Sequence, residues 1–461
     1  MHNHHLQPPP TTTSTGGTTG SNNSSICRIT FSTPFILLIT IIFSLLLILS
    51  LSFSPSSTPL PPHPNPSLFP NFHNYLNSPS NPNDQNTLPS TPPTPPSIAY
   101  LISGSTKDSS RILRLLFAVY HPRNQYLLHL DRKATQKERD ELALAVQSVP
   151  VFKAAQNVNV IGKADFRYSI GSSALSATLH GASILLRLSN SWDWFINLSA
   201  ADYPLVTQDG WREVAGTSGI SQDLLHILSY LPKDLNFVNH SSYIGWRESK
   251  KLKPIVVDPG LYLAEESEVY YASQKRELPD AYRLFTGSSS AILSRKFTEF
   301  CILGSDNLPR TLLMYLSNSP SSESVYFPTV LCNSRKFNGT TINHNMQYAS
   351  FNSRSQVRRL NSSDFNDLVM SGAAFASPFK AGDPVLDKID HELLHHNRDE
   401  PVPGGWCLGD TETNKCTVWG DAEITRPGFG AKRLEKHFLE LFSNGSYLSY
   451  QCQYEKSSSS R

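Results

Sequence analysis

The sequence lacks a charge excess of either sign. Lys and Arg together number 40 and Asp and Glu number 38 in 461 residues, which leaves a formal net charge of +2. Nucleic-acid binding needs a concentrated basic face whose cations replace the phosphate counterions, and the sequence contains no such cluster. This balance argues against a nucleic-acid partner. The chain also has no internal repeat.

Cysteine is scarce, with 6 residues in the whole chain. Cys27 lies close to the N-terminus, and five cysteines follow much later: Cys301, Cys332, Cys407, Cys416 and Cys452. Because five is an odd number, we expect one thiol to stay free. Cys407 and Cys416 flank a short loop and are predicted to form a disulfide, whereas a Cys301 to Cys332 pair is a second candidate that the sequence leaves open.

Long apolar runs are absent except at residues 31–53, where no residue is charged and Ile, Leu and Phe dominate. As a helix, a run of this length crosses about 30 Å of hydrocarbon, so we predict a transmembrane anchor. Arg28 precedes the run and the next cation after it is Lys107. The positive-inside rule therefore places residues 1–30 in the cytosol and the bulk of the chain in the lumen. The alternative is a cleaved signal peptide, which would not normally follow so long a leader.

Composition also divides the rest of the chain. Residues 54–96 are rich in Pro and Ser, and such a segment cannot bury enough apolar surface to offset the entropy of ordering it. We predict a disordered stem there. Regular hydrophobic patterning marks a luminal domain at residues 97–455, followed by a short tail at 456–461.

Glycosylation motifs fit a secretory lumen. They occur at Asn239, Asn338, Asn361 and Asn444. Asn197 also matches the motif, but it lies in an apolar segment that is predicted to be a strand, so we expect it to stay unmodified.

Strand and helix patterns alternate at the start of the predicted domain. An apolar strand at 98–102 is followed by an amphipathic helix after Asp108 and by a second strand at 126–130, which is a βαβ unit. Thr135 and Glu138 have the spacing of a capping box for the next helix. Further strands are expected at 158–161 and 194–198. The face of the first helix is formed by Ile112, Leu115, Leu116 and Val119.

These elements predict an α/β fold with a mostly parallel, doubly wound sheet. Ligands bind beyond the carboxyl ends of the strands in such sheets. Asp131, Gly162 and Asp202 fall at these ends and are therefore candidates for a nucleotide site. Beyond Ser294 the pattern loosens, and residues 401–416 are predicted to be a loop held by a disulfide.

Several strings in this frame form a recognisable series in chain order. They are 98–104 (IAYLISG), 120–131 (YHPRNQYLLHLD), 160–163 (VIGK), 194–208 (WFINLSAADYPLVTQ), 258–262 (DPGLY), 284–288 (LFTGS), 306–311 (DNLPRT), 383–390 (DPVLDKID) and 403–407 (PGGWC). In these strings the chain resembles the core-2/I-branching glycosyltransferase family, specifically its plant β-glucuronosyltransferase branch. The resemblance covers residues 98–452.

The resemblance implies a GT-A-like fold and an inverting transfer with a β-linked product. Such a reaction needs one base within hydrogen-bond reach of the acceptor hydroxyl. By its position in the family pattern that base is Glu323, although the aromatic pair that follows it is one residue further away than usual. A surface-loop glutamate is the alternative interpretation.

Departing UDP carries negative charge, which either a metal or basic side chains must neutralise. No Asp-x-Asp motif precedes Asp202, which agrees with metal-independent members of the family, so no metal ion or other cofactor is expected. The resemblance assigns a phosphate contact to Arg358. The family's second basic contact lies in a Phe-Ala-Arg-Lys-Phe string, which here reads FASPF at 375–379 and has lost both cations. Lys380 is the candidate replacement.

The remaining assignments also follow from the resemblance. Asp131 is expected to contact the uridine, with the backbone of Ser103 and Gly104 close to the base, and Asp202 to lie near the sugar or the acceptor. The acceptor-side loop is predicted from three consecutive residues: Trp246, Arg247 and Glu248. Residues 210–222 interrupt the family pattern and are interpreted as an extruded loop.

Two other functions compete with this interpretation. The string HELLH at 391–395 matches the zincin pattern, in which His391 and His395 would bind zinc and Glu392 would activate water. Alternatively, the altered string at 375–379 and the insertion leave a glycan-binding homologue without turnover.

The preferred function is transfer of glucuronic acid from UDP-glucuronate to β-galactan side chains of type II arabinogalactan. UDP-N-acetylglucosamine and UDP-xylose are the alternative donors. The predicted location is the Golgi membrane, as a single-pass type II protein with a luminal catalytic domain.

Overall fold

The structure is a computed structural model that describes residues 94–168, 170–209, 224–242, 250, 252–262, 268–354, 356–407, 419–423, 431–442 and 452. All of them belong to one unit, residues 63–461. The predicted anchor at 31–53 and the insertion at 210–222 lie outside the described residues. Trp246, Arg247, Glu248, Cys416 and Asn444 also lie outside them. Within the described part of the chain, no helix is long and apolar enough to cross a membrane.

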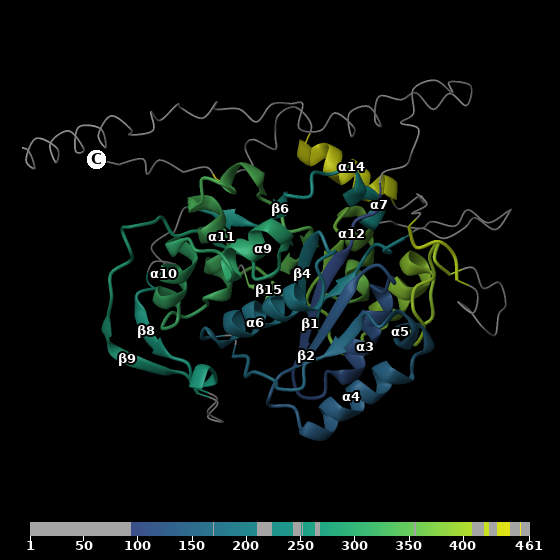
Figure 1. The fold of residues 1–461 in the computed structure, drawn as a ribbon, viewed down its shortest axis with the longest axis horizontal. Helices are drawn as coiled ribbons and strands as arrows, with labels where there is room; N and C mark the ends of the chain where they lie inside the picture. The colour runs from purple at the N-terminus through teal and green to yellow at the C-terminus, as the bar shows by residue number, and fades with distance from the viewer. Residues whose placement is uncertain are drawn as a thin grey trace, which may run out of the picture. The chain divides into compact units, whose positions relative to one another are not determined.

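A seven-stranded sheet runs through the fold in the order β12-β6-β11-β4-β1-β2-β3 (Figure 1). Its strands are β1 (Ile98–Gly104), β2 (Gln125–Leu130), β3 (Val158–Val160), β4 (Trp194–Ser199), β6 (Asn236–Phe237), β11 (Ile292–Ser294) and β12 (Thr341–Ile342). Only β11 runs antiparallel to its neighbours in this sheet, β4 and β6. The other four strand pairs are parallel, so the predicted mostly parallel sheet is confirmed.

Helices cover both faces of this sheet. Successive side chains of a strand point to opposite faces, and β1 accordingly places Ile98, Tyr100 and Ile102 in one apolar cluster and Ala99 and Leu101 in another. The predicted doubly wound arrangement is therefore confirmed. The first cluster includes residues of α3 (Ser109–Ala118), α4 (Gln136–Ser148), α5 (Pro150–Ala155), α7 (Leu224–Ser229), α12 (Phe365–Met370), α13 (Pro384–Ile389) and α14 (Ala431–Phe442). The second includes residues of α6 (Ser173–Leu188), α9 (Arg295–Ile302), α10 (Asn307–Leu316) and α11 (Glu323–Asn333).

The predicted N-terminal elements form for the expected reasons. The apolar face of α3 is fully buried at Ile112, Leu115 and Leu116. At α4, the Thr135 hydroxyl accepts from the Glu138 amide at 3.2 Å, and the Glu138 carboxylate accepts from the Thr135 amide at 2.9 Å. The capping box is therefore confirmed, and a cap of this kind stabilises a helix by about 1 kcal/mol.

Helix α6 lies unusually close to β1 because of a glycine. A Cβ built at Gly181 would lie 2.7 Å from a methyl group of Leu101, which is closer than two carbon atoms normally approach. The N-terminus of α6 is capped from outside the helix, since buried Asp258 accepts from the Ser173 amide at 2.7 Å. Together these contacts fix the position of α6 against the sheet.

The C-terminal half of the chain returns to the carboxyl edge of the sheet. Strand β16 (Phe375–Ala376) pairs with β5 (Tyr203–Pro204) and with β13 (Gln347–Tyr348). The Phe379 amide then donates to the Ala201 carbonyl at 2.9 Å, and Leu360 forms a parallel bridge with Phe379. The string at 375–379 is thus built against the loop that follows β4.

Three antiparallel pairs of strands complete the described fold. They are β7 (His240–Ser241) with β10 (Thr286–Gly287), β8 (Pro254–Val257) with β9 (Tyr270–Lys275), and β14 (Ser350–Phe351) with β15 (Val357–Arg358).

The disulfide prediction needs a correction. Cys332 bonds to Cys452, 120 residues away, so the candidate pair of Cys301 with Cys332 is wrong. Cys301 is the free cysteine of the described residues, and its thiol hydrogen-bonds with the Tyr326 side chain. Cys407 is disulfide-bonded, while its predicted partner Cys416 lies outside the described residues.

The predicted glycosylation sites differ in exposure. Asn197 is buried in β4 and its side-chain amide donates to the Ser289 carbonyl at 2.8 Å, in agreement with an unmodified residue. Asn338 and Asn361 are exposed, whereas Asn239 is half-buried and donates to Asn345.

Candidate active site at the carboxyl edge of the sheet

Asp131 follows β2 directly and is buried. Its carboxylate accepts from the Lys133 amide at 2.8 Å and from the Arg167 amide at 3.2 Å. Burial raises the pKa of Asp131. The hydrogen bonds from these two backbone amides and the positive charges of Lys133 and Arg167 oppose the rise. The end of β1 lies beside it, where a Cβ at Gly104 would come within 2.8 Å of the Asp108 Cβ. A glycine is therefore needed where Ser103 and Gly104 end the strand.

Asp202 lies in the loop after β4 and is also buried. Its carboxylate accepts from the Ser199 amide at 2.8 Å and is hydrogen-bonded with the Ser377 side chain. Burial raises the pKa of Asp202 to about 6, against the opposing effects of these hydrogen bonds and of the Arg167 and Arg111 charges. The serine that replaces a cation in the family string therefore contacts this acid.

Glu323 is the first residue of α11 and faces the same region. Its carboxylate accepts from the Arg167 guanidinium at 2.7 Å and from the Thr178 hydroxyl at 3.1 Å. The side chain is only 16% exposed, so the surface-loop interpretation is wrong. Helices α6 and α11 together position this carboxylate.

Arg167 joins these three acids, although it was not among the site residues predicted from the sequence. Its backbone amide donates a hydrogen bond to Asp131, and its guanidinium forms an ion pair with Glu323. Its positive charge also lowers the pKa of Asp202. The residue lies in the loop after β3, which is another carboxyl end of the same sheet. That position was a usable signal, because Gly162 in the same loop was already a candidate.

The expected phosphate contacts lie on neighbouring segments. Arg358 forms two hydrogen bonds with the buried Asp364 carboxylate, one of them at 2.8 Å. These bonds raise the pKa of Arg358 and lower that of Asp364. Lys380 is exposed, and no hydrogen bond or ion pair joins its ammonium group to the rest of the described chain. Arg358 therefore needs to share its guanidinium with Asp364 if it binds a phosphate.

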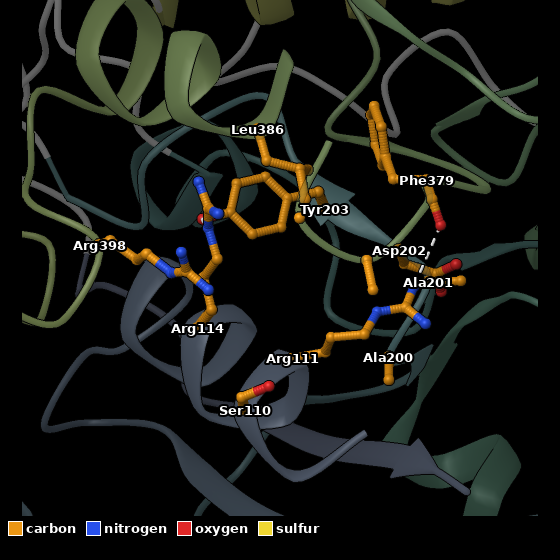
Figure 2. Close-up of a pocket in the computed structure, with 12 residues that line it drawn as sticks. Ser110, Arg111, Arg114, Ala200, Ala201, Asp202, Tyr203, Phe379, Leu386 and Arg398 are labelled. Atoms are coloured by element: carbon orange, nitrogen blue, oxygen red, sulfur yellow. Dashed lines mark hydrogen bonds between the residues drawn. The ribbon is translucent and has the colours of Figure 1, made fainter. Parts of the chain in front are cut away.

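A small pocket that is open to solvent lies beside Asp202 (Figure 2). Arg111 points from α3 toward Phe379 and Asp202, with Arg114 and Arg398 on the other side of the hollow. The Arg111 guanidinium donates to Asp108 at 2.9 Å and to the Phe379 carbonyl at 3.0 Å.

One wall of the pocket is held by a buried ionic network around Asp390. Arg114 donates two hydrogen bonds to the Asp390 carboxylate, at 2.6 and 3.1 Å. The same carboxylate is also hydrogen-bonded to the Tyr203 hydroxyl and to a ring nitrogen of His396. Burial alone would raise the pKa of Asp390, but the bonds from His396 and Tyr203 and the Arg114 charge bring it below its usual value. The network anchors the segment after α13 to the sheet.

The zincin interpretation is wrong. Residues Asp390–Leu394 form a single π-helical turn, and His395 follows it with a φ of 51°. His391 and His395 therefore do not share the face of an α-helix, which the pattern requires. Glu392 instead pairs with Lys388 on the surface.

A metal site is not formed by the acids of the sheet edge. Among the described residues, one group of His, Cys and acidic side chains has ligand atoms within 4.8 Å of one another, and it comprises His240, Cys332 and Cys452. Two of these three are joined in the disulfide. Asp131 and Asp202 are each held by backbone amides instead.

Comparisons with known proteins show the family of this chain. The family model of the Core-2/I-Branching enzyme matches residues 98–368. The chain is 47% identical to Beta-glucuronosyltransferase GlcAT14B of Arabidopsis thaliana over 360 residues, covering 77% of this chain and 80% of the relative. It is 46% identical to Beta-glucuronosyltransferase GlcAT14A of the same organism, covering 77% of each.

A solved structure, that of the galactosyltransferase LgtC with donor and acceptor sugar analogues, aligns with 8% identity and a TM-score of 0.29. The alignment covers 65% of this chain and 97% of that one. A similarity this weak carries no argument, and the fold rests on the sheet described above.

Proposed function

Since this chain belongs to the Core-2/I-Branching enzyme family, and is a glycosyltransferase with relatives named as beta-glucuronosyltransferases, we propose that it transfers glucuronic acid from UDP-glucuronate to β-galactan side chains of type II arabinogalactan. The observation that carries this proposal is the carboxylate of Glu323, held by Arg167 and Thr178 near the two buried acids of the sheet edge.

Glu323 is the general base of the proposed reaction. It takes the proton of the acceptor hydroxyl as the hydroxyl oxygen forms a bond with the anomeric carbon and the bond to UDP breaks. Attack from the face opposite to UDP inverts the anomeric centre and gives a β-linked product. Thr178 and Arg167 orient the carboxylate before the acceptor arrives, which reduces the entropic cost of the reacting geometry.

The leaving diphosphate needs cations, and in this proposal side chains supply them without a metal ion. Arg358 and Lys380 are the candidates, because the bridge between Leu360 and Phe379 puts their segments side by side. Asp131 is proposed to contact the uridine at the ends of β1 and β2. The acceptor loop at 246–248 remains part of the proposal and lies outside the described residues.

The location of the reaction is proposed from the N-terminal sequence. An uncharged run at residues 31–53 supports a single-pass anchor, and the Pro- and Ser-rich segment after it supports a stem. The enzyme would then work in the Golgi lumen, where nucleotide sugars and glycan acceptors meet.

The test is a donor screen. The luminal domain would be assayed by mass spectrometry with β-galactan oligosaccharides and UDP-glucuronate, UDP-N-acetylglucosamine or UDP-xylose. We expect transfer from UDP-glucuronate alone, and Glu323→Gln should lower kcat by about 10² to 10⁴ because no general base remains. Glu299→Gln is the matched control, since Glu299 also pairs with an arginine but on α9. Full activity of Glu323→Gln would refute this base.

A second candidate function is glycan binding without turnover. It is favoured by the residues at 375–379, where Ser377 and Pro378 stand in place of two cations. Under this alternative the wild-type protein binds galactan oligosaccharides but transfers no sugar from any of the three donors.

A further inference from the structure

The pocket beside Asp202 lies where the strand order reverses. From β1 the chain passes through α3 to β2, whereas α6 leads back from β3 to β4 on the other side of β1. The pocket is lined by the start of α3, which follows β1, and by the loop after β4. It therefore opens where β1 and β4 lie side by side (Figure 2). Ligands of doubly wound sheets bind at this topological switch point.

Three arginine side chains line this pocket, and they differ in how far their guanidinium groups are already paired within the protein. Arg114 is neutralised by Asp390 and Asp387 and is 5% exposed. Arg398 is exposed, and within the described part of the chain its guanidinium has neither a hydrogen bond nor an ion pair. Arg111 is 22% exposed and shares its donors between Asp108 and a backbone carbonyl. Arg111 and Arg398 therefore provide cationic donors on two sides of one hollow.

The rest of the lining is small or apolar. Ala200, Ala201, Ala381 and Gly382 leave room near the cations, and Tyr203 and Phe379 complete this part of the lining. Asp202 is the acid among the lining residues. Since burial raises its pKa to about 6, near that pH half of the molecules carry a neutral carboxylic acid there, which donates a hydrogen bond instead of repelling an anion.

Arg111 also reaches the segment from which the expected cations are missing. Its guanidinium donates to the carbonyl of Phe379, 268 residues further along the chain, and the residue before Phe379 is Pro378. A cation from α3 thus lies against the string at 375–379 although that string contains none.

We propose that Arg111 and Arg398 form an oxyanion subsite that binds an anionic group of the nucleotide-sugar donor. This inference rests on the proposed function. A guanidinium binds a carboxylate or a phosphate through paired N–H donors, so the sugar carboxylate and the diphosphate share the chemistry that this subsite recognises. The affinities of donors with and without the carboxylate distinguish the two sources.

The experiment measures binding by isothermal titration calorimetry with UDP-glucuronate, UDP-xylose and UDP. The first variant is Arg398→Gln, which breaks no hydrogen bond or ion pair between described residues. Its matched control is Arg335→Gln, because Arg335 is exposed and similarly lacks such partners but does not line the pocket. Loss of one charge-assisted contact should weaken binding about tenfold to a hundredfold.

Two outcomes support the subsite and identify its ligand. If Arg398→Gln weakens UDP-glucuronate alone, the sugar carboxylate is bound there. If it weakens all three ligands equally, the diphosphate is bound there. The subsite is overturned if Arg398→Gln binds all three ligands like Arg335→Gln, and if Arg111→Gln, checked for folding by thermal unfolding, does so too.

Failure of the proposed function gives a different result. The same variants would be titrated with D-glucuronate and with inorganic pyrophosphate, which need no sugar transfer to bind. A wild-type protein that transfers no sugar but binds either anion through Arg398 refutes the proposed function and keeps the subsite. A wild-type protein that transfers glucuronic acid while both arginine variants bind normally refutes the subsite only.

Discussion

At the scale of single residues, the site depends on buried charges that the fold holds at a cost. Asp202 shows this most clearly, because burial raises its pKa from the usual 3.8 to about 6. Between these two values the folded state keeps a proton that the unfolded state has released. The free energy of unfolding therefore decreases as the pH rises from about 4 to about 6, by about 3 kcal/mol in total.

Asp202→Asn should flatten this part of the stability profile. The asparagine cannot ionise, so the variant avoids the cost of a buried carboxylate above pH 6 while its side-chain oxygen still accepts from the Ser199 amide. Urea unfolding at several values between pH 4 and pH 7 measures the slope. Asp280→Asn, at an exposed aspartate, should keep the wild-type slope. A profile of Asp202→Asn that parallels wild type would contradict the assigned pKa.

Arg167 is expected to be a positioning residue for Glu323. Arg167→Met keeps much of the side-chain volume but removes the 2.7 Å contact, so the carboxylate loses one of its two orienting partners. We expect kcat for glucuronosyl transfer to fall about tenfold to a hundredfold, because misplacing a catalytic group is costly. Steady-state kinetics measure the effect, and Arg167→Lys should recover part of kcat. Unchanged kcat in Arg167→Met would rule this role out.

At the scale of elements, the network around Asp390 ties the segment after α13 to α3 and β5. Arg114→Met should lower the free energy of unfolding by about 3 to 5 kcal/mol, since it leaves a buried carboxylate without its cation. The double variant Arg114→Met with Asp390→Asn should recover part of this loss, because the uncompensated charge is gone. Urea denaturation of the two single variants and the double variant gives the coupling energy. Strict additivity would mean that the two side chains do not depend on each other.

The disulfide between Cys332 and Cys452 joins α11 to the C-terminal segment. Cys452→Ser should lower stability by about 2 to 5 kcal/mol, since the bond closes a loop of 120 residues in the unfolded chain. Thermal unfolding without reductant measures the effect. Cys301→Ser removes a thiol without breaking this bond and should retain the cross-link by mass spectrometry. Equal stability of Cys452→Ser and wild type would show that the bond does not contribute.

Long periodic elements were predictable from sequence, and short ones were not. β1, α3, β2 and α4 carry complete hydrophobic or capping patterns, and all four were found where expected. β6, β11 and β12 have two or three residues each, which is too short for an alternation to show. The disulfide partner of Cys332 depends on chain packing over 120 residues, which spacing cannot reveal.

Site residues that directly follow a regular strand could be predicted from the sequence, whereas those that come together through tertiary contacts could not. Asp131 and Asp202 follow strands, so their common edge could be inferred from the strand pattern. Arg167 comes from an irregular loop, and Arg111 and Arg398 line one pocket only because residues after α13 fold back onto α3. No local pattern marks Arg111 and Arg398, since their roles arise from tertiary contacts, and for Arg167 the strand pattern indicates the loop but not the residue.

At the scale of the whole molecule, the proposed chemistry uses side-chain cations and no metal ion. Dialysis against EDTA should therefore leave the transfer rate of the protein unchanged, and added Mn²⁺ or Mg²⁺ should not raise it. A radiolabelled donor assay before and after chelation measures this. A loss of activity that returns with one of these metals would overturn the metal-free proposal.

The pairing of Cys332 with Cys452 has a consequence for thiol exchange. A free thiol in an oxidising compartment can exchange with existing disulfides, because its thiolate attacks their sulfur atoms. Desolvation, opposed only by the bond with Tyr326, raises the pKa of Cys301 and keeps its sulfur in the unreactive protonated form. The molecule therefore carries an unpaired sulfhydryl without the scrambling that it would otherwise cause.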